Sequence, residues 1–322
     1  MRIAHFILAL IYFLSASISI AQQQEKSMVL YTHYLLYVPK TLPDSGYPLL
    51  LFLHGSDERG NDLSNLKSKG PPSFLDKKQD FPFVVLSPQC PEGREWDTQN
   101  LLALLDHIEA SLSIDKSRIY VTGLSMGGFA TWNLAQVAPE RFAAIAPICG
   151  GGNLDRICIM RDVPVWAFHG AKDTAVPYEE SERLVQRLKE FGSDVKYTLY
   201  PDAGHDSWTK TYENPELYDW LLSKSKNKDS PIIDDRILKS YAGRYRYSND
   251  EIIEVTYDGK DLYVKSSVAD RKIQIVPFTN TKFRIPGPLS GDGDMYFNVT
   301  KEVRVEGFTV GPCDHTYCPR ID

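Results

Sequence analysis

The residues best suited to do chemistry are a serine inside a Gly-x-Ser-x-Gly pattern and an aspartate and a histidine that follow it. Ser125 lies in the motif of residues 123–127, Asp173 follows in a His-Gly-Ala-Lys-Asp segment, and His205 in an Ala-Gly-His-Asp-Ser segment. A serine hydroxyl becomes nucleophilic when a histidine takes its proton and a carboxylate orients that histidine. The chain order Ser, Asp, His is typical of hydrolases with a nucleophile elbow. We therefore predict Ser125 as nucleophile, His205 as base and Asp173 as acid.

The segments on either side of Ser125 favour a nucleophile elbow. An apolar, β-branched run at 118–122 leads into the motif, and a helix-compatible segment at 127–137 follows it. A sharp turn from strand to helix strains the serine backbone and leaves no room for bulky neighbours, which explains the glycines. The alternative interpretation is a glycine-rich packing turn, but the strand before and the helix after favour the elbow.

An oxyanion hole needs two N–H donors close to the nucleophile. We predict the amide of Met126, the residue after Ser125, as the first donor. The second is expected from the His54-Gly55-Ser56 loop, and we favour the Ser56 amide. His54 itself is interpreted as a structural residue of that turn.

Two further questions are which carboxylate acts as the acid and which residues bind the substrate. Asp202 and Asp206 compete with Asp173 as the acid, but both are too close in sequence to His205 to reach the back of its ring easily. Trp96 and Trp208 are candidate substrate-binding residues that would form an aromatic wall. Ordinary packing is the alternative for both tryptophans.

The elements that must position these loops alternate between strands and helices. Buried strands are predicted from continuous apolar runs at 48–53, 83–86, 142–147 and 163–168, with further strands at 30–38 and 195–200. Helices are predicted at 100–112, 178–191 and 215–222, the first capped by Asn100. This alternation predicts an α/β fold, a mostly parallel sheet with helices on both faces. Ligand chemistry in such a fold gathers at the carboxyl ends of the strands, where all the quoted loops lie.

The composition changes near residue 223. Residues 224–233 are polar, lysine-rich and contain a proline, which indicates a linker. From 234 to 322, short strand-like runs separated by turn signals replace the alternation with helices. We predict a small all-β domain there, a sandwich or a barrel, which follows a catalytic domain at 22–223.

The first 21 residues are predicted to be a signal peptide. They begin with Arg2, continue as an apolar stretch and end in Ser19-Ile20-Ala21, a small-x-small cleavage signal. An uncleaved membrane anchor is the alternative, but the serines in the stretch and the cleavage signal favour removal. We therefore expect an exported protein, periplasmic or secreted, without a membrane span after signal removal. The formal net charge of −6 and the lack of a long basic run argue against a nucleic-acid partner.

The five cysteines leave the disulfide pairing open. The closest pairs in sequence are Cys149–Cys158 and Cys313–Cys318, which would leave Cys90 as a buried thiol. Cys313, His315 and Cys318 are an alternative set of metal ligands, but it is one ligand short of a zinc site and lies at the chain end. We therefore predict neither a metal nor another cofactor.

Residues from about 28 to 222 resemble the α/β-hydrolase superfamily, and more narrowly the bacterial carboxylesterase and feruloyl-esterase-like group related to phospholipase/carboxylesterase and dienelactone hydrolase enzymes. The resemblance rests on residues 51–55 with 58–60, 87–91 with Trp96, 118–128, 166–170 with Asp173, and 204–208. It implies Ser125 as nucleophile, Asp173 as acid and His205 as base. Dienelactone hydrolases carry a cysteine at the nucleophile position, so the serine here argues against that activity. Residues from about 234 to 309 resemble a small β domain appended to some bacterial hydrolases.

The resemblance and the predicted triad imply an exported serine carboxylic-ester hydrolase that acts through an acyl-enzyme. Its substrate would be a small-molecule or polysaccharide-linked ester, with feruloyl or acetyl esters of plant polysaccharide as the specific expectation. One alternative is a serine peptidase of the prolyl-oligopeptidase type, although such enzymes usually carry a large gating domain that is absent here. The other is a non-enzymatic carbohydrate-binding protein that uses the β domain, and the intact triad counts against it. The oligomeric state stays open.

Overall fold

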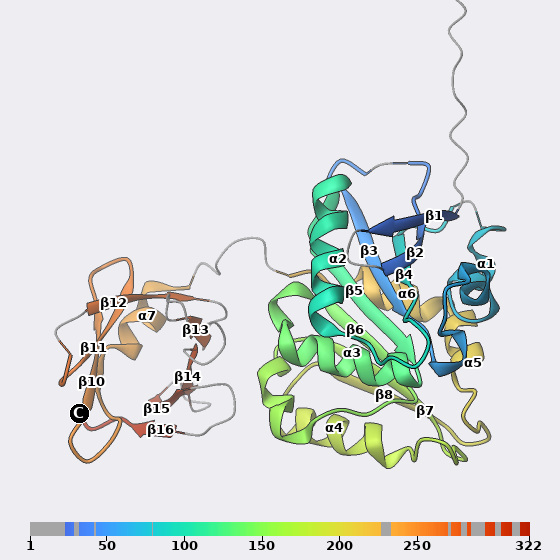
Figure 1. Ribbon diagram of the computed structural model, residues 1–322. Coiled ribbons are helices and arrows are strands. Elements are labelled where there is room, and N and C mark those ends of the chain that lie inside the picture. The colour runs from blue at the N-terminus through green and yellow to red at the C-terminus, as the bar shows by residue number, and fades with distance from the viewer. Residues whose placement is uncertain are drawn as a thin grey trace, which may run out of the picture.

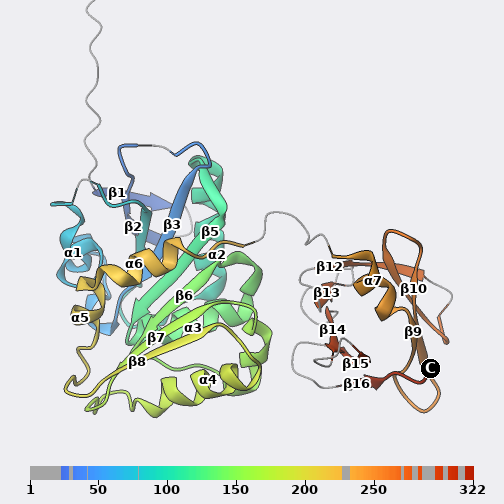
Figure 2. The same cartoon turned by 180° about the vertical axis from the view of Figure 1, so that it is seen from behind.

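The computed structural model has two units, shown from opposite sides in Figures 1 and 2. It describes residues 23–28, 32–41, 43–78, 80–226, 233–269, 272–277, 282–284, 294–299, 304–310 and 316–322. The predicted signal peptide and most of the predicted linker lie outside the described residues. No helix within these ranges has the length and apolarity needed to cross a bilayer.

The first unit is built on an eight-stranded mixed sheet with the strand order β1-β2-β4-β3-β5-β6-β7-β8. The strands are β1 (Gln23–Met28), β2 (Thr32–Tyr37), β3 (Tyr47–Leu53), β4 (Val84–Pro88), β5 (Ile114–Leu124), β6 (Ala144–Ile148), β7 (Val165–Gly170) and β8 (Val195–Tyr200). The strands from β3 to β8 run parallel, whereas β1 and β2 are antiparallel at one edge. The predicted α/β fold class is confirmed.

Helices cover both faces of this sheet because its central strands are apolar on both sides. In β3, Leu49 and Leu51 pack in one core cluster with residues of α2 (Thr98–Ser111), α3 (Met126–Val137) and α4 (Glu179–Glu190). Leu50 and Phe52 pack in a second cluster with residues of α1 (Pro72–Leu75), α5 (Trp208–Glu213) and α6 (Pro215–Leu222). Figure 1 shows α2, α3 and α4 over one face, and Figure 2 shows α5 and α6 over the other.

The start of α2 differs from the sequence prediction. The helix begins at Thr98, and the side chain of Asp97 accepts a hydrogen bond from the Asn100 amide at 2.9 Å. The predicted cap at Asn100 is therefore wrong, because Asp97 supplies the acceptor three residues earlier.

The strand order changes direction at the centre of the sheet. The chain passes from β3 to its neighbour β4 on one side, and then to β5, which is the neighbour of β3 on the other side. The connections after β3 and after β5 therefore leave the same edge of the sheet in opposite directions, and open α/β sheets bind ligands at this crevice. The segment 54–56 follows β3, and Ser125 follows β5.

The second unit is a closed antiparallel barrel. Its strands are β9 (Gly243–Arg246), β10 (Ile252–Tyr257), β11 (Leu262–Ser266), β12 (Lys272–Pro277), β13 (Lys282–Arg284), β14 (Asp294–Val299), β15 (Val305–Val310) and β16 (Thr316–Pro319), preceded by α7 (Asp235–Tyr241). They pair in sequence order, and a bridge between Tyr245 and Arg320 brings the first and last strands together. Aromatic rings fill the interior, where Tyr241 of α7 stacks on Phe297 at 4.3 Å between ring centroids. Of the two architectures predicted, the structure is the barrel.

Two contacts join the units at the segment that leads into β7. Lys282 Nζ lies 3.2 Å from Asp162 Oδ2, and the Arg161 guanidinium lies 3.4 Å from the centroid of the Tyr296 ring. In a parallel sheet, the start of β7 lies at the edge opposite to the carboxyl end of β5. The barrel therefore contacts the edge of the sheet that lies away from Ser125.

Cys149 and Cys158, which are close in sequence, do not form a disulfide with each other. Cys90 and Cys149 are free and buried, and Cys158 is disulfide-bonded. Cys149 directly follows β6, and its Sγ lies 3.3 Å from the Ser125 amide nitrogen. The Cys149–Cys158 pair is therefore excluded, and the expected buried thiol at Cys90 is confirmed. Cys313 and His315 lie outside the described residues.

Candidate active site

Ser125 occupies a strained turn between β5 and α3. Its φ of +52° lies in the left-handed region, which is unusual for a residue other than glycine. Its amide donates to the Ile148 carbonyl at 3.0 Å, which ties the turn to the end of β6. A Cβ at Gly127 would lie 1.9 Å from the Leu53 carbonyl oxygen, so glycine is required where α3 crosses β3. The turn has the geometry of a nucleophile elbow.

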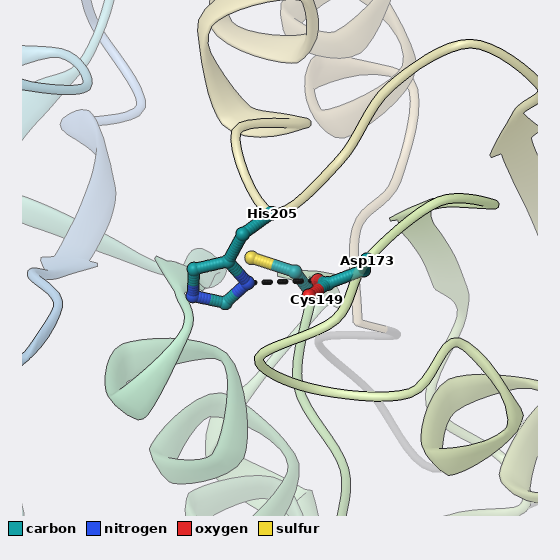
Figure 3. Close-up of side chains that lie close together, drawn as sticks. All are labelled: Cys149, Asp173 and His205. Atoms are coloured by element: carbon teal, nitrogen blue, oxygen red, sulfur yellow. Dashed lines mark hydrogen bonds and ion pairs between the residues drawn. The ribbon is translucent and has the colours of Figure 1, made fainter.

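The structure brings Ser125, His205 and Asp173 into one hydrogen-bonded chain. His205 Nε2 lies 2.9 Å from Ser125 Oγ, and Nδ1 lies 2.7 Å from Asp173 Oδ2. Figure 3 shows the bond between the imidazole and the carboxylate, with each side chain on a different loop. Because an ionised carboxylate only accepts, Nδ1 carries a proton and Nε2 is left to accept the serine proton. The arrangement can therefore deprotonate Ser125.

Asp173 is held as an anion by its surroundings. Burial alone would raise its pKa, but hydrogen bonds from His205 and from the Val176 and Ala175 amides lower it overall. The two amides donate to Oδ1, each at 2.9 Å, which leaves Oδ2 for the imidazole.

The two competing carboxylates have other partners. Asp202 is exposed and pairs with Lys172 at 3.1 Å. Asp206 accepts from the amide and the hydroxyl of Thr209, both at 3.0 Å. Neither carboxylate takes the position behind the imidazole that Asp173 occupies.

The two backbone amides predicted as oxyanion donors belong to residues that begin helices. Met126 is the first residue of α3, and Ser56 is the first residue of η1 (Ser56–Glu58). The first amides of a helix have no acceptor within that helix, so both remain available. The Gly55 amide, by contrast, donates to Glu58 Oε2 at 3.0 Å. This leaves Ser56 as the next donor in the loop.

His54 connects this loop to the segment that follows β4 through two hydrogen bonds of its ring. Its Nε2 accepts from the Cys90 amide at 2.9 Å, so Nδ1 must carry the proton that it donates to the Gly55 carbonyl at 2.6 Å. Burial lowers the pKa of His54 to about 4, so the ring is neutral at ordinary pH. Protonation would set a second N–H against the Cys90 amide.

We expect this buried histidine to make the protein less stable in acid. The unfolded chain binds a proton at His54 near pH 6.5, whereas the folded protein binds it near pH 4, so folding loses stability as pH falls between these values. The free energy of unfolding should drop by about 2 kcal/mol between pH 7 and pH 5 from this group. Urea denaturation at the two pH values measures it.

His54→Gln is expected to reduce that drop. His107, an exposed residue of α2, provides the matched control, because His107→Gln should leave the drop unchanged. An equal pH dependence in wild type and His54→Gln would contradict the assignment.

The two predicted tryptophans, Trp208 and Trp96, contact His205 and His54, respectively. The Trp208 ring lies edge-on to His205 at 5.3 Å between centroids and is 9% exposed. Trp96 Nε1 donates to the His54 carbonyl at 3.2 Å, and its ring packs on the His54 ring at 4.7 Å. A substrate contact at either ring stays a prediction.

Cys149 belongs to the site although sequence reasoning did not place it there. Its Sγ lies 3.3 Å from the Ser125 amide, and Figure 3 shows the sulfur beside the imidazole ring of His205. Cys149, Asp173 and His205 offer ligand atoms within 4.8 Å of one another, as a metal site would. The donors do not fit a resident ion, however, because both Asp173 oxygens are engaged and burial raises the pKa of the Cys149 thiol to about 12. The signal in the sequence was its position shortly after the predicted strand at 142–147.

Comparison with known proteins supports the fold of the first unit. Residues 89–228, which contain Ser125, Asp173 and His205, match the dienelactone hydrolase family. A solved thermostable esterase aligns with a TM-score of 0.55 and 36% identity, over 64% of this chain and 63% of that one. The first unit has the α/β-hydrolase fold. The family resemblance inferred from the sequence is confirmed.

Two curated relatives of this chain are similar over parts of their length. The bifunctional acetylxylan esterase/xylanase of Neocallimastix patriciarum is 30% identical over 200 residues, 58% of this chain and 27% of that protein. Poly(3-hydroxyalkanoate) depolymerase C of Paucimonas lemoignei is 52% identical over 134 residues, 36% of this chain and 30% of that protein. The chain spans less than a third of the length of either relative.

Proposed function

We propose that this protein is a serine carboxylic-ester hydrolase that acts through an acyl-enzyme. The observation that carries the proposal is the 2.9 Å contact between Ser125 Oγ and His205 Nε2, with Asp173 bonded behind the ring. Similarity to an esterase and to an acetylxylan esterase supports esters as the substrate class.

In the proposed reaction, Ser125 Oγ attacks the ester carbonyl while His205 Nε2 takes the hydroxyl proton. The carbonyl oxygen becomes an oxyanion that the Met126 and Ser56 amides stabilise, and one such donor lowers the barrier by about 3 kcal/mol. His205 then protonates the leaving alcohol, and a water molecule hydrolyses the acyl-enzyme by the same steps. Asp173 stabilises the imidazolium that forms.

We further propose that the protein acts after export on feruloyl or acetyl esters of plant polysaccharide. The predicted signal peptide at 1–21 supports export. The similarity to an acetylxylan esterase supports this substrate class. In this proposal Trp96 and Trp208 flank the bound ester.

A panel of three substrates tests the proposed activity. We expect turnover of p-nitrophenyl acetate and of methyl ferulate, and little turnover of an aminoacyl anilide, whose amine leaving group needs stronger protonation. Turnover is followed by absorbance at one pH with the full mature chain. Faster turnover of the anilide than of the esters would instead favour a peptidase of the prolyl-oligopeptidase type.

A further inference from the structure

Lys69 contacts both the segment that follows β3 and the first residue of α5. Its Nζ lies 2.6 Å from Glu58 Oε1 and 3.2 Å from Asp57 Oδ2, in the loop that follows β3. The same ammonium lies over the Trp208 ring, 5.3 Å from its centroid. Trp208 follows His205 by three residues, so one cation contacts the oxyanion side and the imidazole side of the site.

On the oxyanion side, the contact acts through Glu58. Its carboxylate is almost fully buried, and its second oxygen accepts the Gly55 amide at 3.0 Å. The next amide in the chain is that of Ser56, whose direction follows from how the Gly55 peptide is held. A buried carboxylate needs a partner charge, and in the described part of the chain Lys69 is the cation within ion-pair distance of Glu58.

On the imidazole side, the contact acts through Trp208. The indole stands perpendicular to the His205 ring at 5.3 Å and is itself nearly buried. An ammonium over an indole face is attracted to it, and the attraction is larger where water is partly excluded. Lys69 therefore limits how far the Trp208 ring, and with it the His205 loop, moves away from the loop after β3.

The backbone that carries Lys69 is itself fixed against the sheet. Gly70 has φ +64°, and a Cβ there would lie 2.5 Å from the Phe52 ring of β3. The lysine thus projects from a turn packed on the same strand that leads to the oxyanion loop.

We propose that Lys69 is a positioning residue for ester hydrolysis in this protein. Through Glu58 it fixes the direction of the Ser56 amide. Through Trp208 it holds the His205 loop at a fixed position relative to that amide. Lys69 touches none of the reacting atoms, and its kinetic role rests on the function proposed above. Oxyanion donors contribute only when they are held at the position where the charge develops.

The test compares Lys69→Met, which keeps most of the stem, with Lys69→Arg and with Lys67→Met. Lys67 is the matched control because it lies two residues away and forms an exposed pair with Asp76. For p-nitrophenyl acetate we expect Lys69→Met to lower kcat about tenfold with KM within about twofold. Affinity for a phenylboronic acid, which forms a tetrahedral adduct on the serine, should weaken in parallel. Lys69→Arg should keep most of the wild-type kcat and most of the wild-type affinity for the boronic acid.

Amide hydrogen exchange provides a readout that does not depend on ester turnover. Lys69→Met should speed exchange in residues 54–58 relative to wild type and to Lys67→Met. If the wild-type protein hydrolyses no ester, the proposed function fails, while this exchange measurement still tests the positioning role. Equal exchange in Lys69→Met and Lys67→Met, or a change in KM alone, would overturn the proposal.

The double variant Glu58→Gln/Lys69→Met covers the case in which Lys69→Met does not fold. It removes both charges, and the glutamine oxygen can still accept from the Gly55 amide. We expect this variant to fold and to keep a reduced kcat because the connection to Trp208 is lost. Wild-type kcat in the double variant would contradict a role for Lys69.

Discussion

Asp173→Asn is expected to fold and to lose about three to four orders of magnitude in kcat. Asp173 Oδ1 accepts from two backbone amides, so the oxygen of an asparagine would take that place. Its NH₂ group would then face His205 Nδ1 and donate to it. The imidazole would carry its proton on Nε2, pointing toward Ser125, and could no longer accept the hydroxyl proton.

The kinetic constants for p-nitrophenyl acetate measure this effect at a pH near neutrality. Asp202→Asn is the matched control, because Asp202 lies on the neighbouring loop but is exposed and pairs with Lys172. Asp202→Asn should retain nearly full activity. Activity of Asp173→Asn within tenfold of wild type would show that the imidazole does not depend on this carboxylate.

Gly127→Ala is expected to destabilise the first unit by about 3 kcal/mol or more and to abolish turnover. The added Cβ would lie 1.9 Å from the Leu53 carbonyl oxygen and 2.7 Å from that of His54. Both are backbone atoms of β3 and the loop after it, so neither can move without shifting the strand. The same shift would displace the Ser56 amide from Ser125.

Urea denaturation measures the loss, with Gly204→Ala as the control. A Cβ at Gly204 meets only the Lys172 carbonyl oxygen within 4 Å, at an ordinary contact distance of 3.7 Å. That variant should unfold at nearly the wild-type urea concentration. If Gly127→Ala were as stable as Gly204→Ala, α3 would not be packed against β3 as closely as described.

The α/β fold was predictable because its signals are local. A strand buried on both faces must be apolar at successive positions, as in Leu49–Phe52, and such runs alternate with helical periodicity along the chain. Chain order and the placement of loops after strands were enough to select Ser125, Asp173 and His205. The structure brings these residues into contact, and their catalytic roles stay predictions.

Features that depend on pairing between distant residues were not predictable. β1 (Gln23–Met28) is polar in sequence, and its place at the sheet edge is set by backbone pairing with β2. Closure of the barrel depends on Tyr245 meeting Arg320, and nothing near either residue signals the choice over a sandwich. The disulfide state of Cys149 and Cys158 likewise follows from tertiary position rather than spacing.

The supporting residues of the candidate site were missed for the same reason. Nothing in the polar segment around Lys69 signals a contact with the site, and its partner Glu58 is buried only by the fold. Cys149 lies just after a predicted strand, and its contact with the Ser125 amide arises only when β5 and β6 pair.

Active-site labelling tests the central claim most directly. The mature protein is incubated with a fluorophosphonate, which reacts with activated serines, and the adduct is located by intact mass and peptide mapping. We predict one adduct per chain, on Ser125, with ester turnover lost in proportion to labelling and neither label nor turnover in Ser125→Ala. Ester turnover that survives in Ser125→Ala, or an adduct on another residue, would contradict the account.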